Sequence, residues 1–208
     1  MSLRGLYAIT SEAVCRDHRA LPEAVRAALR GGAVLVQYRD KWNPPARRFA
    51  LARELVVLCR EAGAKLVIND DPQLAMDSGA DGVHLGASDA GLGAARTQLG
   101  PRALIGVTCG NRIDRALEAQ DGGASYVSFG RFFESRTKPE APPASPDLLQ
   151  GIGGRIHLPI CVIGGLTPEN AAPLVADGAS LVAAVGGVFG ATDIEAAARR
   201  YSALFGPP

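Results

Sequence analysis

The sequence predicts an α/β protein folded as a single (β/α)8 barrel, the TIM barrel architecture, over residues 1–208. Helix-like and strand-like segments alternate along the whole chain, and this alternation indicates parallel strands joined by helical crossovers. Eight apolar runs fit eight strands, and no linker is long enough to separate a second domain. Eight such units in a chain of this length favour a closed barrel. A doubly wound open sheet is the alternative.

A short glycine motif marks the junctions between the predicted helices and strands. Glycine just past a helix end tolerates a positive φ, and a following alanine lets the chain turn tightly into a strand. The copies of the motif are Gly31-Gly32-Ala33, Ala62-Gly63-Ala64, Ser78-Gly79-Ala80, Gly122-Gly123-Ala124 and Asp177-Gly178-Ala179.

The predicted strands are the short apolar runs between these signals. Amphipathic stretches separate them, as in residues 45–61, where Leu51, Leu55 and Leu58 recur at helical spacing. In chain order the strands are Leu6–Thr10, Val34–Arg39, Lys65–Asn69, Gly82–Leu85, Ala103–Thr108, Tyr126–Gly130, Ile160–Gly164 and Leu181–Val185.

The composition limits the function classes. Hydrophobic residues make up 47% of the chain and charged residues 21%, which is typical of a folded domain with a sizeable core. A net charge of +1 gives no electrostatic basis for binding nucleic acid or an acidic membrane. Four widely spaced cysteines, no signal-peptide pattern and no apolar run near the roughly 20 residues of a membrane span predict a cytoplasmic protein with free thiols.

The second predicted strand ends in an unusual polar run. Alternation along an extended chain places Gln37, Arg39 and Lys41 on one face. Two cations and an amide that point the same way suit a phosphate or pyrophosphate. A solvated strand end is the other interpretation, but in a parallel barrel the site lies at the carboxyl ends of the strands, and other strands also end in polar residues.

Two carboxylates follow the third and fourth predicted strands. Asp70 and Asp89, with no Cys or His cluster nearby, suit Mg²⁺, which binds through one or two carboxylates and substrate phosphates. Each could instead cap a helix, since Asp70 precedes Pro72 and Asp89 opens the helix that runs through Arg96. The pairing of the two beside cations favours the metal.

Glycine pairs follow the seventh and eighth predicted strands. Gly164-Gly165 and Gly186-Gly187 stand where barrel enzymes commonly bind phosphate through bare backbone amides, although both pairs could merely turn the chain. After the sixth strand, residues 135–138 combine hydroxyls and cations at the start of a proline-rich loop, which suits a lid over an anionic ligand. His84 is expected to be a core residue rather than a base, and no Ser-His-Asp or Cys-His arrangement supports acyl transfer.

Taken in order, these motifs closely resemble the thiamine phosphate synthase family over nearly the whole chain. The resemblance implies the same barrel and a transferase that joins hydroxymethylpyrimidine diphosphate to a thiazole phosphate, releasing diphosphate. The matching segments are Leu6-Tyr7-Ala8-Ile9-Thr10, Gln37-Tyr38-Arg39-Asp40-Lys41, Ile68-Asn69-Asp70-Asp71, Gly82-Val83-His84-Leu85-Gly86 with Asp89, Gly106-Val107-Thr108-Cys109, Thr137-Lys138 and Ile163-Gly164-Gly165-Leu166.

The resemblance also implies roles for individual residues. Asp70 and Asp89 would hold Mg²⁺, and Arg39, Lys41 and Lys138 would act on the leaving diphosphate. The pyrimidine diphosphate would be held by Gln37, Tyr38, Arg39, Asp40, Lys41, Asn69, Thr108 and Lys138. The thiazole phosphate would be held by Ser135, Arg136, Thr137, Gly165, Val185 and Gly186.

The chain departs from the family pattern at a few positions. Ala87 stands where glutamine is common, Gly110 where histidine is frequent, and Gly186-Gly187 where the first residue is usually serine or histidine. Thr108 and Ser135 are conservative changes that keep a hydroxyl. The change at Gly186 removes a side-chain donor close to the expected thiazole phosphate.

Two other functions compete with the synthase. A related thiazole tautomerase would need no diphosphate site, and such enzymes carry a histidine after the sixth strand, where this chain has Gly130-Arg131. A non-catalytic sensor of phosphate ligands would not need both carboxylates. The expected partners are the two small-molecule substrates, with neither nucleic acid nor membrane. The sequence leaves open a homo-oligomer and a carboxylated thiazole substrate.

Overall fold

The computed structural model describes residues 3–17, 19–86, 91–135, 142–152 and 154–206. Four residues with predicted roles lie outside these ranges, namely Asp89, Arg136, Thr137 and Lys138. The first of the departures from the family pattern, Ala87, lies outside them as well.

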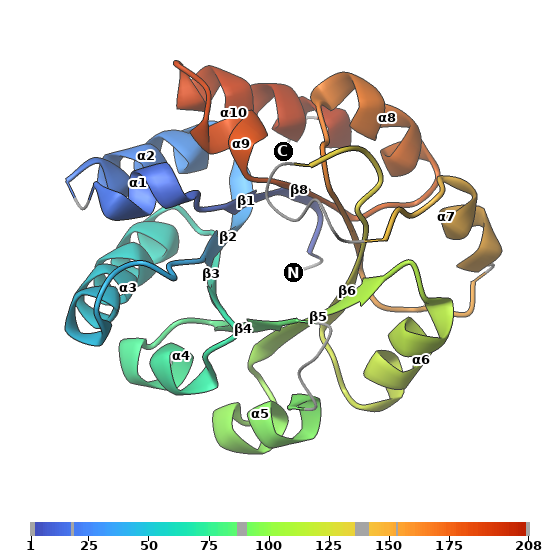
Figure 1. Ribbon diagram of the computed structural model, residues 1–208, viewed down its shortest axis with the longest axis horizontal. Helices are drawn as coiled ribbons and strands as arrows, with labels where there is room; N and C mark the ends of the chain where they lie inside the picture. The colour runs from blue at the N-terminus through green and yellow to red at the C-terminus, as the bar shows by residue number, and fades with distance from the viewer. Residues whose placement is uncertain (1–2, 18, 87–90, 136–141, 153, 207–208) are drawn as a thin grey trace.

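The strands form one closed parallel barrel in which each strand pairs with its neighbours in sequence and β1 pairs with β8 (Figure 1). This closure confirms the predicted barrel and rejects the open sheet. The strands are β1 (Gly5–Ile9), β2 (Ala33–Tyr38), β3 (Lys65–Asn69), β4 (Gly82–Leu85), β5 (Leu104–Gly110), β6 (Tyr126–Phe129), β7 (Ile160–Ile163) and β8 (Leu181–Ala184). The third and fourth have the predicted bounds, and the others differ at either end by no more than two residues.

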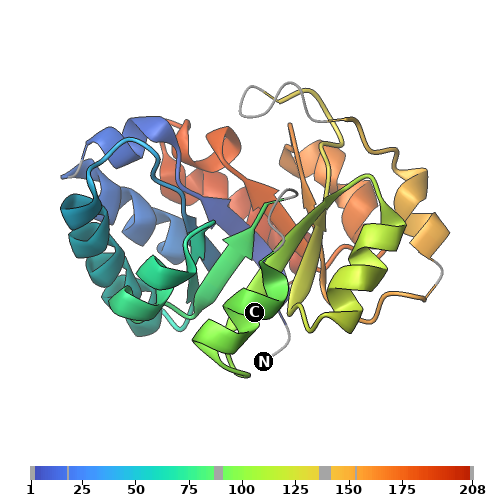
Figure 2. The same cartoon turned by 60° about the horizontal axis from the view of Figure 1, so that its bottom comes forward.

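Helices surround the barrel (Figures 1 and 2). The helix predicted over residues 45–61 has those bounds and buries Leu51, Leu55 and Leu58. Within the described ranges, no helix is long and apolar enough to cross a membrane. The helices are α1 (Glu12–Arg16), α2 (Ala20–Arg30), α3 (Pro45–Glu61), α4 (Pro72–Ser78), α5 (Leu92–Leu99), α6 (Ile113–Asp121), α7 (Asp147–Ile152), α8 (Pro168–Ala176), α9 (Gly186–Phe189), α10 (Ile194–Ser202) and η1 (Ala203–Phe205).

The glycine motif ends helices as predicted. At the end of α4, Gly79 has a φ of 76°, and its N–H donates to the carbonyls of Ala75 and Met76. A side chain would be strained at this φ, so glycine ends the helix at little cost. Positive φ angles also occur at the motif residues Gly32, Gly63, Gly123 and Gly178.

The core has two layers. The larger layer lies between the barrel and the helices and includes Leu21, Leu55 and Leu174. A second cluster fills the barrel interior, where Tyr7 and Tyr126 are almost completely buried. This interior cluster fills the barrel below the carboxyl ends of the strands.

Candidate active site

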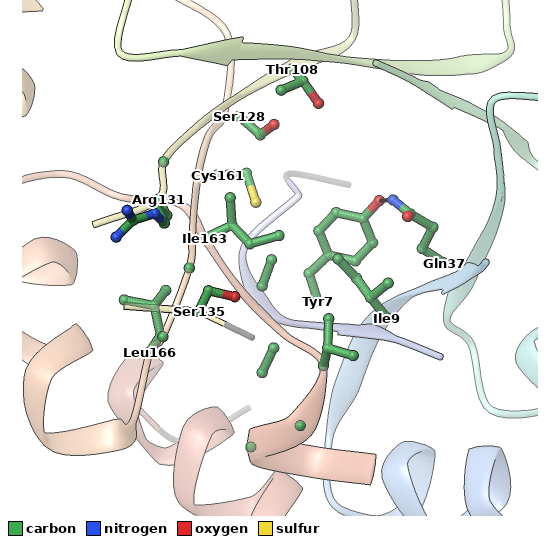
Figure 3. A pocket seen from close by; sticks show the side chains of 18 of the residues that line it. Tyr7, Ile9, Gln37, Thr108, Ser128, Arg131, Ser135, Cys161, Ile163 and Leu166 are labelled. Atoms are coloured by element: carbon green, nitrogen blue, oxygen red, sulfur yellow. Dashed lines mark hydrogen bonds between the residues drawn. The ribbon is translucent and has the colours of Figure 1, made fainter. Parts of the chain in front are cut away.

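A cavity of about 300 Å³ opens at the carboxyl ends of the strands (Figure 3). Residues from or just after every strand line it, as expected for a site built on a parallel barrel. The lining residues are Tyr7, Ile9, Gln37, Arg39, Asn69, His84, Thr108, Ser128, Gly130, Arg131, Glu134, Ser135, Cys161, Ile163, Gly164, Gly165, Leu166, Ala183, Ala184, Val185, Gly186 and Gly187.

Apart from Tyr7 and Ile9 of β1, the lining divides into two arcs of different chemistry. The β2–β5 arc, which consists of Gln37, Arg39, Asn69, His84 and Thr108, presents polar side chains. The β6–β8 arc presents glycine backbone and apolar side chains, together with a few polar groups. It consists of Ser128, Gly130, Arg131, Glu134, Ser135, Cys161, Ile163, Gly164, Gly165, Leu166, Ala183, Ala184, Val185, Gly186 and Gly187. Most predicted substrate-binding residues within the described ranges therefore share one cavity.

Arg39 is held at the mouth by the first strand. The Arg39 backbone N–H donates to Thr10 Oγ1 at 2.9 Å, and the same hydroxyl donates back to the Arg39 carbonyl at 3.3 Å. Thr10 is fully buried, so this clamp fixes the backbone from which the guanidinium extends. The Arg39 guanidinium carbon lies 5.7 Å from the centre of the Trp42 ring, within the range of a cation–π contact.

Tyr38 and Asp40 point away from the cavity and stabilise the turn after β2. The Asp40 carboxylate accepts hydrogen bonds from Tyr38 Oη at 2.7 Å and from the backbone N–H groups of Trp42 and Asn43, both at 3.0 Å. Burial raises the pKa of Asp40, but these hydrogen bonds outweigh it and hold the pKa below its usual range. Direct contact of either residue with the diphosphate stays a prediction, and the geometry gives both a structural task.

Lys41 and Asp70 meet beside the mouth. Lys41 Nζ lies 3.5 Å from Asp70 Oδ2, and both side chains are exposed. Asp70 adopts a φ of 60°, and its backbone N–H donates to the His84 carbonyl at 2.9 Å. A non-glycine residue in this conformation is uncommon and concentrates at functional sites.

The cap of α4 is Asp71, not Asp70. The Asp71 side chain accepts from the Leu74 N–H at 2.9 Å, so the capping interpretation of Asp70 is wrong. For α5 the cap residue is Gly91. The carboxylate of Asp70 is therefore available to a ligand, and among the described residues it pairs with the exposed Lys41.

The donor set fits a hard cation that is shared with a substrate. In the ranges that the structure describes, no three His, Cys, Asp or Glu side chains gather into a complete metal cage. Mg²⁺ does not need one, because it binds through one or two carboxylates and completes its octahedron with water and phosphate oxygens. Asp70 supplies such an oxygen at the mouth of the β2–β5 arc.

The glycines of the β7 loop allow close backbone packing. A Cβ at Gly164 would lie 2.3 Å from Arg131 Cβ, and one at Gly165 would lie 2.2 Å from the Glu134 carbonyl oxygen. The segment after β6 therefore packs directly on this loop, and the backbone N–H of Phe132 donates to the Ile163 carbonyl at 3.1 Å. These contacts explain the glycines structurally and hold Ser135 at the rim.

The two glycines at the start of α9 differ. Apart from its own neighbours in the chain and the backbone of α9, no atom of the described residues lies within 4 Å of a Cβ built at Gly186, whereas one at Gly187 would lie 2.1 Å from Tyr201 Oη. The first turn of a helix leaves backbone N–H groups without intrahelical partners, and here they border the cavity. Gly186 thus faces open space in the site, and Gly187 is required by packing.

Several residues that line the cavity lie within strands rather than at strand ends, so the strand-end pattern did not predict them. Tyr7, Ser128 and Cys161 come from within strands and point into the barrel (Figure 3). His84 is a satisfied core residue, as predicted, because its Nδ1 lies 3.0 Å from Tyr126 Oη and its Nε2 lies 2.9 Å from Thr108 Oγ1. Polar side chains at alternate, inward positions of apolar strands were the signal that could have identified this group.

Comparisons with known proteins show the family to which the chain belongs. The family model described as thiamine monophosphate synthase matches residues 6–188. The chain is 50% identical to the thiamine-phosphate synthase of Alcanivorax borkumensis over 206 residues, covering 98% of this chain and 94% of that protein. It is also 50% identical to the thiamine-phosphate synthase of Marinobacter nauticus over 208 residues, covering 97% and 90%.

A solved structure gives the same result. The thiamine phosphate pyrophosphorylase from Pyrococcus furiosus superposes with a TM-score of 0.87 and 29% identity, covering 98% of this chain and 96% of that one. Sequence and fold therefore agree over almost the full length. The chain belongs to the thiamine monophosphate synthase family.

Proposed function

We propose that this cavity joins hydroxymethylpyrimidine diphosphate to a thiazole phosphate, giving thiamine phosphate and diphosphate. One observation carries the proposal. A polar arc with a cation and a glycine-rich arc face each other across a single cavity that is large enough for two small rings. Family membership supports the same reaction.

The pyrimidine diphosphate is assigned to the β2–β5 arc. Gln37, Asn69 and Thr108 offer hydrogen bonds to the ring and its substituents, and Arg39 lies at the rim, where a diphosphate would emerge. Lys41, beside Asp70, adds a second cation. Lys138 is assigned to the same diphosphate on the family resemblance, and Tyr38 with Asp40 supports this arc from behind.

Mg²⁺ is assigned to Asp70 together with Asp89. The exposed carboxylate and unusual backbone of Asp70, beside Lys41, support this assignment. When bound, the cation would neutralise charge that accumulates on the leaving diphosphate. The pair of carboxylates also distinguishes this proposal from a tautomerase or a sensor, neither of which has a diphosphate to expel.

The thiazole phosphate is assigned to the β6–β8 arc. Gly165, Val185 and Gly186 offer backbone amides at the rim, and Ser135 adds a hydroxyl. Arg136 and Thr137 complete this set on the family resemblance. The apolar side chains of Ile163 and Leu166 on the same arc suit the faces of a thiazole ring.

The chemistry needs charge stabilisation and alignment more than proton transfer. A diphosphate on a benzyl-like carbon can leave before the nucleophile attacks, and the thiazole nitrogen already carries a lone pair. The cavity accordingly offers the hydrogen-bond donors and cations that such chemistry needs. Two rings held on opposite arcs would place the nitrogen of one beside the exocyclic carbon of the other.

The remaining assignments concern the whole enzyme. We assign residues 1–208 to one catalytic domain that works in the cytoplasm. All four cysteines are free and buried, as suits a reducing compartment.

Steady-state kinetics with both substrates tests the proposal. Thiamine phosphate and diphosphate should form in equal amounts. Gly186→Val should raise the KM for the thiazole phosphate, because the valine side chain would occupy space that this ligand needs on the β6–β8 arc. The KM for the pyrimidine diphosphate should stay unchanged, because that ligand is assigned to the other arc. Asn69→Ala should raise the KM for the pyrimidine diphosphate and leave the KM for the thiazole phosphate unchanged. If the two variants exchange these effects, the arcs are assigned the wrong way round.

A further inference from the structure

Five polar side chains form a continuous hydrogen-bonded chain across the barrel interior. The Gln37 amide nitrogen donates to Tyr7 Oη (Figure 3), and Tyr7 Oη lies 2.9 Å from Tyr126 Oη. Tyr126 Oη lies 3.0 Å from His84 Nδ1, and His84 Nε2 lies 2.9 Å from Thr108 Oγ1. Both ends, Gln37 and Thr108, line the cavity. We call this set the interior relay.

The interior relay depends on the absence of a side chain at Gly106 on β5. His84, Gly106 and Tyr126 stand at the same level on three adjacent strands, β4, β5 and β6. A Cβ at Gly106 would lie 2.1 Å from Tyr126 Cζ and 2.5 Å from His84 Nδ1. The missing side chain therefore lets the two neighbours meet over β5, and any larger residue would separate them.

The middle of the interior relay does not touch a ligand. Tyr126 is fully buried and does not line the cavity, whereas Tyr7, Gln37, His84 and Thr108 do. Burial raises the pKa of both Tyr7 and Tyr126 far above the usual value, so each keeps its proton. Tyr126 is thus a positioning residue that can act on a ligand only through its neighbours.

The polarity of the interior relay follows from its atoms. A hydroxyl donates one hydrogen bond, and a neutral imidazole has one donor nitrogen and one acceptor nitrogen. When every link donates in the same direction, Gln37 donates to Tyr7, Tyr7 to Tyr126, Tyr126 to His84 Nδ1, and His84 Nε2 to Thr108. The Gln37 carbonyl oxygen then remains an acceptor for the ligand, and the Thr108 hydroxyl remains a donor.

We propose that the interior relay sets the substrate specificity of the site by giving its two ends opposite hydrogen-bonding polarity. A matching ligand has an amine donor toward Gln37 and an oxygen or nitrogen acceptor toward Thr108, as an aminopyrimidine diphosphate does. The inference rests on the assignment of this substrate to the β2–β5 arc. It adds Tyr7, Tyr126 and His84 as the residues that hold the polarity.

The alternative polarity exists but must reverse every link together. If the Gln37 amide turned over to present its nitrogen to the ligand, Tyr7, Tyr126 and Thr108 would all have to rotate their hydroxyls, and His84 would have to change tautomer. Thr108, at the other end of the interior relay, would then present an acceptor to an acceptor on the ligand, and the two would not form a hydrogen bond. Cutting the chain at Tyr126 frees Gln37 to turn over alone, since Tyr7 Oη can donate as well as accept.

Equilibrium binding of two ligands tests this. The probes are hydroxymethylpyrimidine diphosphate and its counterpart with an oxo group in place of the amine, which reverses the donor and acceptor on that edge of the ring. Their Kd values are measured by calorimetry with Mg²⁺ and without the thiazole phosphate, so turnover plays no part. The wild type should prefer the amine by about 100-fold or more, because a mismatch leaves buried polar groups unpaired.

Tyr126→Phe should reduce this preference by about tenfold or more, mainly by tightening the binding of the oxo ligand. Tyr7→Phe should also reduce this preference, and it replaces Tyr126→Phe in the test if Tyr126→Phe does not fold. Tyr201→Phe is the matched control. It removes another buried hydroxyl, one that donates to the Leu166 carbonyl at 2.7 Å outside the interior relay, and should keep the wild-type preference.

The proposal is overturned if the wild type does not prefer the amine, or if folded Tyr126→Phe or Tyr7→Phe keeps the full preference. Equal losses in Tyr126→Phe and Tyr201→Phe would also overturn it, because they would indicate a general effect of a weakened core. Failure of the proposed reaction is a separate result. It would appear as wild-type enzyme that binds the amine ligand but forms no thiamine phosphate with the second substrate.

Discussion

Asp70 and Asp71 are neighbours with different tasks. Asp71 caps α4, whereas Asp70 holds a left-handed backbone conformation beside Lys41. Such a conformation costs on the order of 1 kcal/mol or more and persists only where the surroundings enforce it. The Asp70 carboxylate does not cap a helix and lies at the mouth of the site, so we assign the cation to it.

Asp70→Asn should lower kcat/KM by about 10²–10³, because the cation that would neutralise the leaving diphosphate loses a carboxylate ligand. Asp71→Ala is the matched control and should cost about 1 kcal/mol of stability through the lost cap, with activity retained by the folded enzyme. Turnover at a series of Mg²⁺ concentrations measures the activity of both variants, and urea unfolding measures the stability cost of Asp71→Ala. Full wild-type turnover in excess chelator would rule out the metal assignment.

Asp40→Asn should destabilise the fold by about 1–2 kcal/mol at pH 7, because the buried carboxylate accepts several hydrogen bonds. The pKa of Asp40 is lowered in the folded state, so its stabilisation is present above the unfolded pKa of about 4 and is lost as pH falls through the folded value. The difference from wild type should therefore shrink below about pH 4.

Urea unfolding at several pH values measures this difference. Asp121→Asn, on the exposed surface of α6, is the control and should show no such pH-dependent difference. If the cost of Asp40→Asn is the same at pH 7 and at low pH, the ionised carboxylate is not what stabilises the turn.

At the scale of elements, the short helix α9 joins the binding site to the core. Its first residue faces open space and its second packs on Tyr201. Gly187→Ala should therefore cost about 1–3 kcal/mol of stability by overpacking, and Gly186→Ala should change stability by less than about 0.5 kcal/mol. Thermal unfolding of the two variants measures this, and equal melting temperatures would contradict the packing.

The segment after β6 is the second functional element. Its first residues pack on the β7 loop, and the family resemblance places Lys138 farther along it. Lys138→Ala should lower kcat by about 10²–10³ with little change in KM, because negative charge on the diphosphate grows in the transition state. An unchanged kcat with a raised KM would indicate uniform binding of the ground state instead.

Local signals were enough to predict the elements. The apolar runs and the glycine motif predicted both ends of every strand to within two residues. This was possible because helix ends and the apolar character of a strand depend on residues that are close in sequence. The cap at Asp71 was not predicted, and capping was considered only as the alternative role of Asp70, since either aspartate could begin a helix before Pro72.

At the scale of the molecule, closure of the barrel creates contacts that no local pattern contains. The interior relay joins side chains from β2, β1, β6, β4 and β5, and Tyr7 and Tyr126 are 119 positions apart. Polar groups at strand ends could be predicted because parallel strands all end at one mouth. The contacts among polar groups inside the barrel could not be predicted, because they depend on which strands face each other across it.

A crystal structure with the pyrimidine diphosphate, Mg²⁺ and no thiazole phosphate tests the central claim most directly, namely that the β2–β5 arc holds the diphosphate substrate. We expect the ring amine at the Gln37 carbonyl, the diphosphate at Arg39 and Lys41, and the cation on Asp70, with the β6–β8 arc left open for the second ring. Diphosphate bound at Gly165 and Gly186 instead, with no cation on Asp70, would contradict the account.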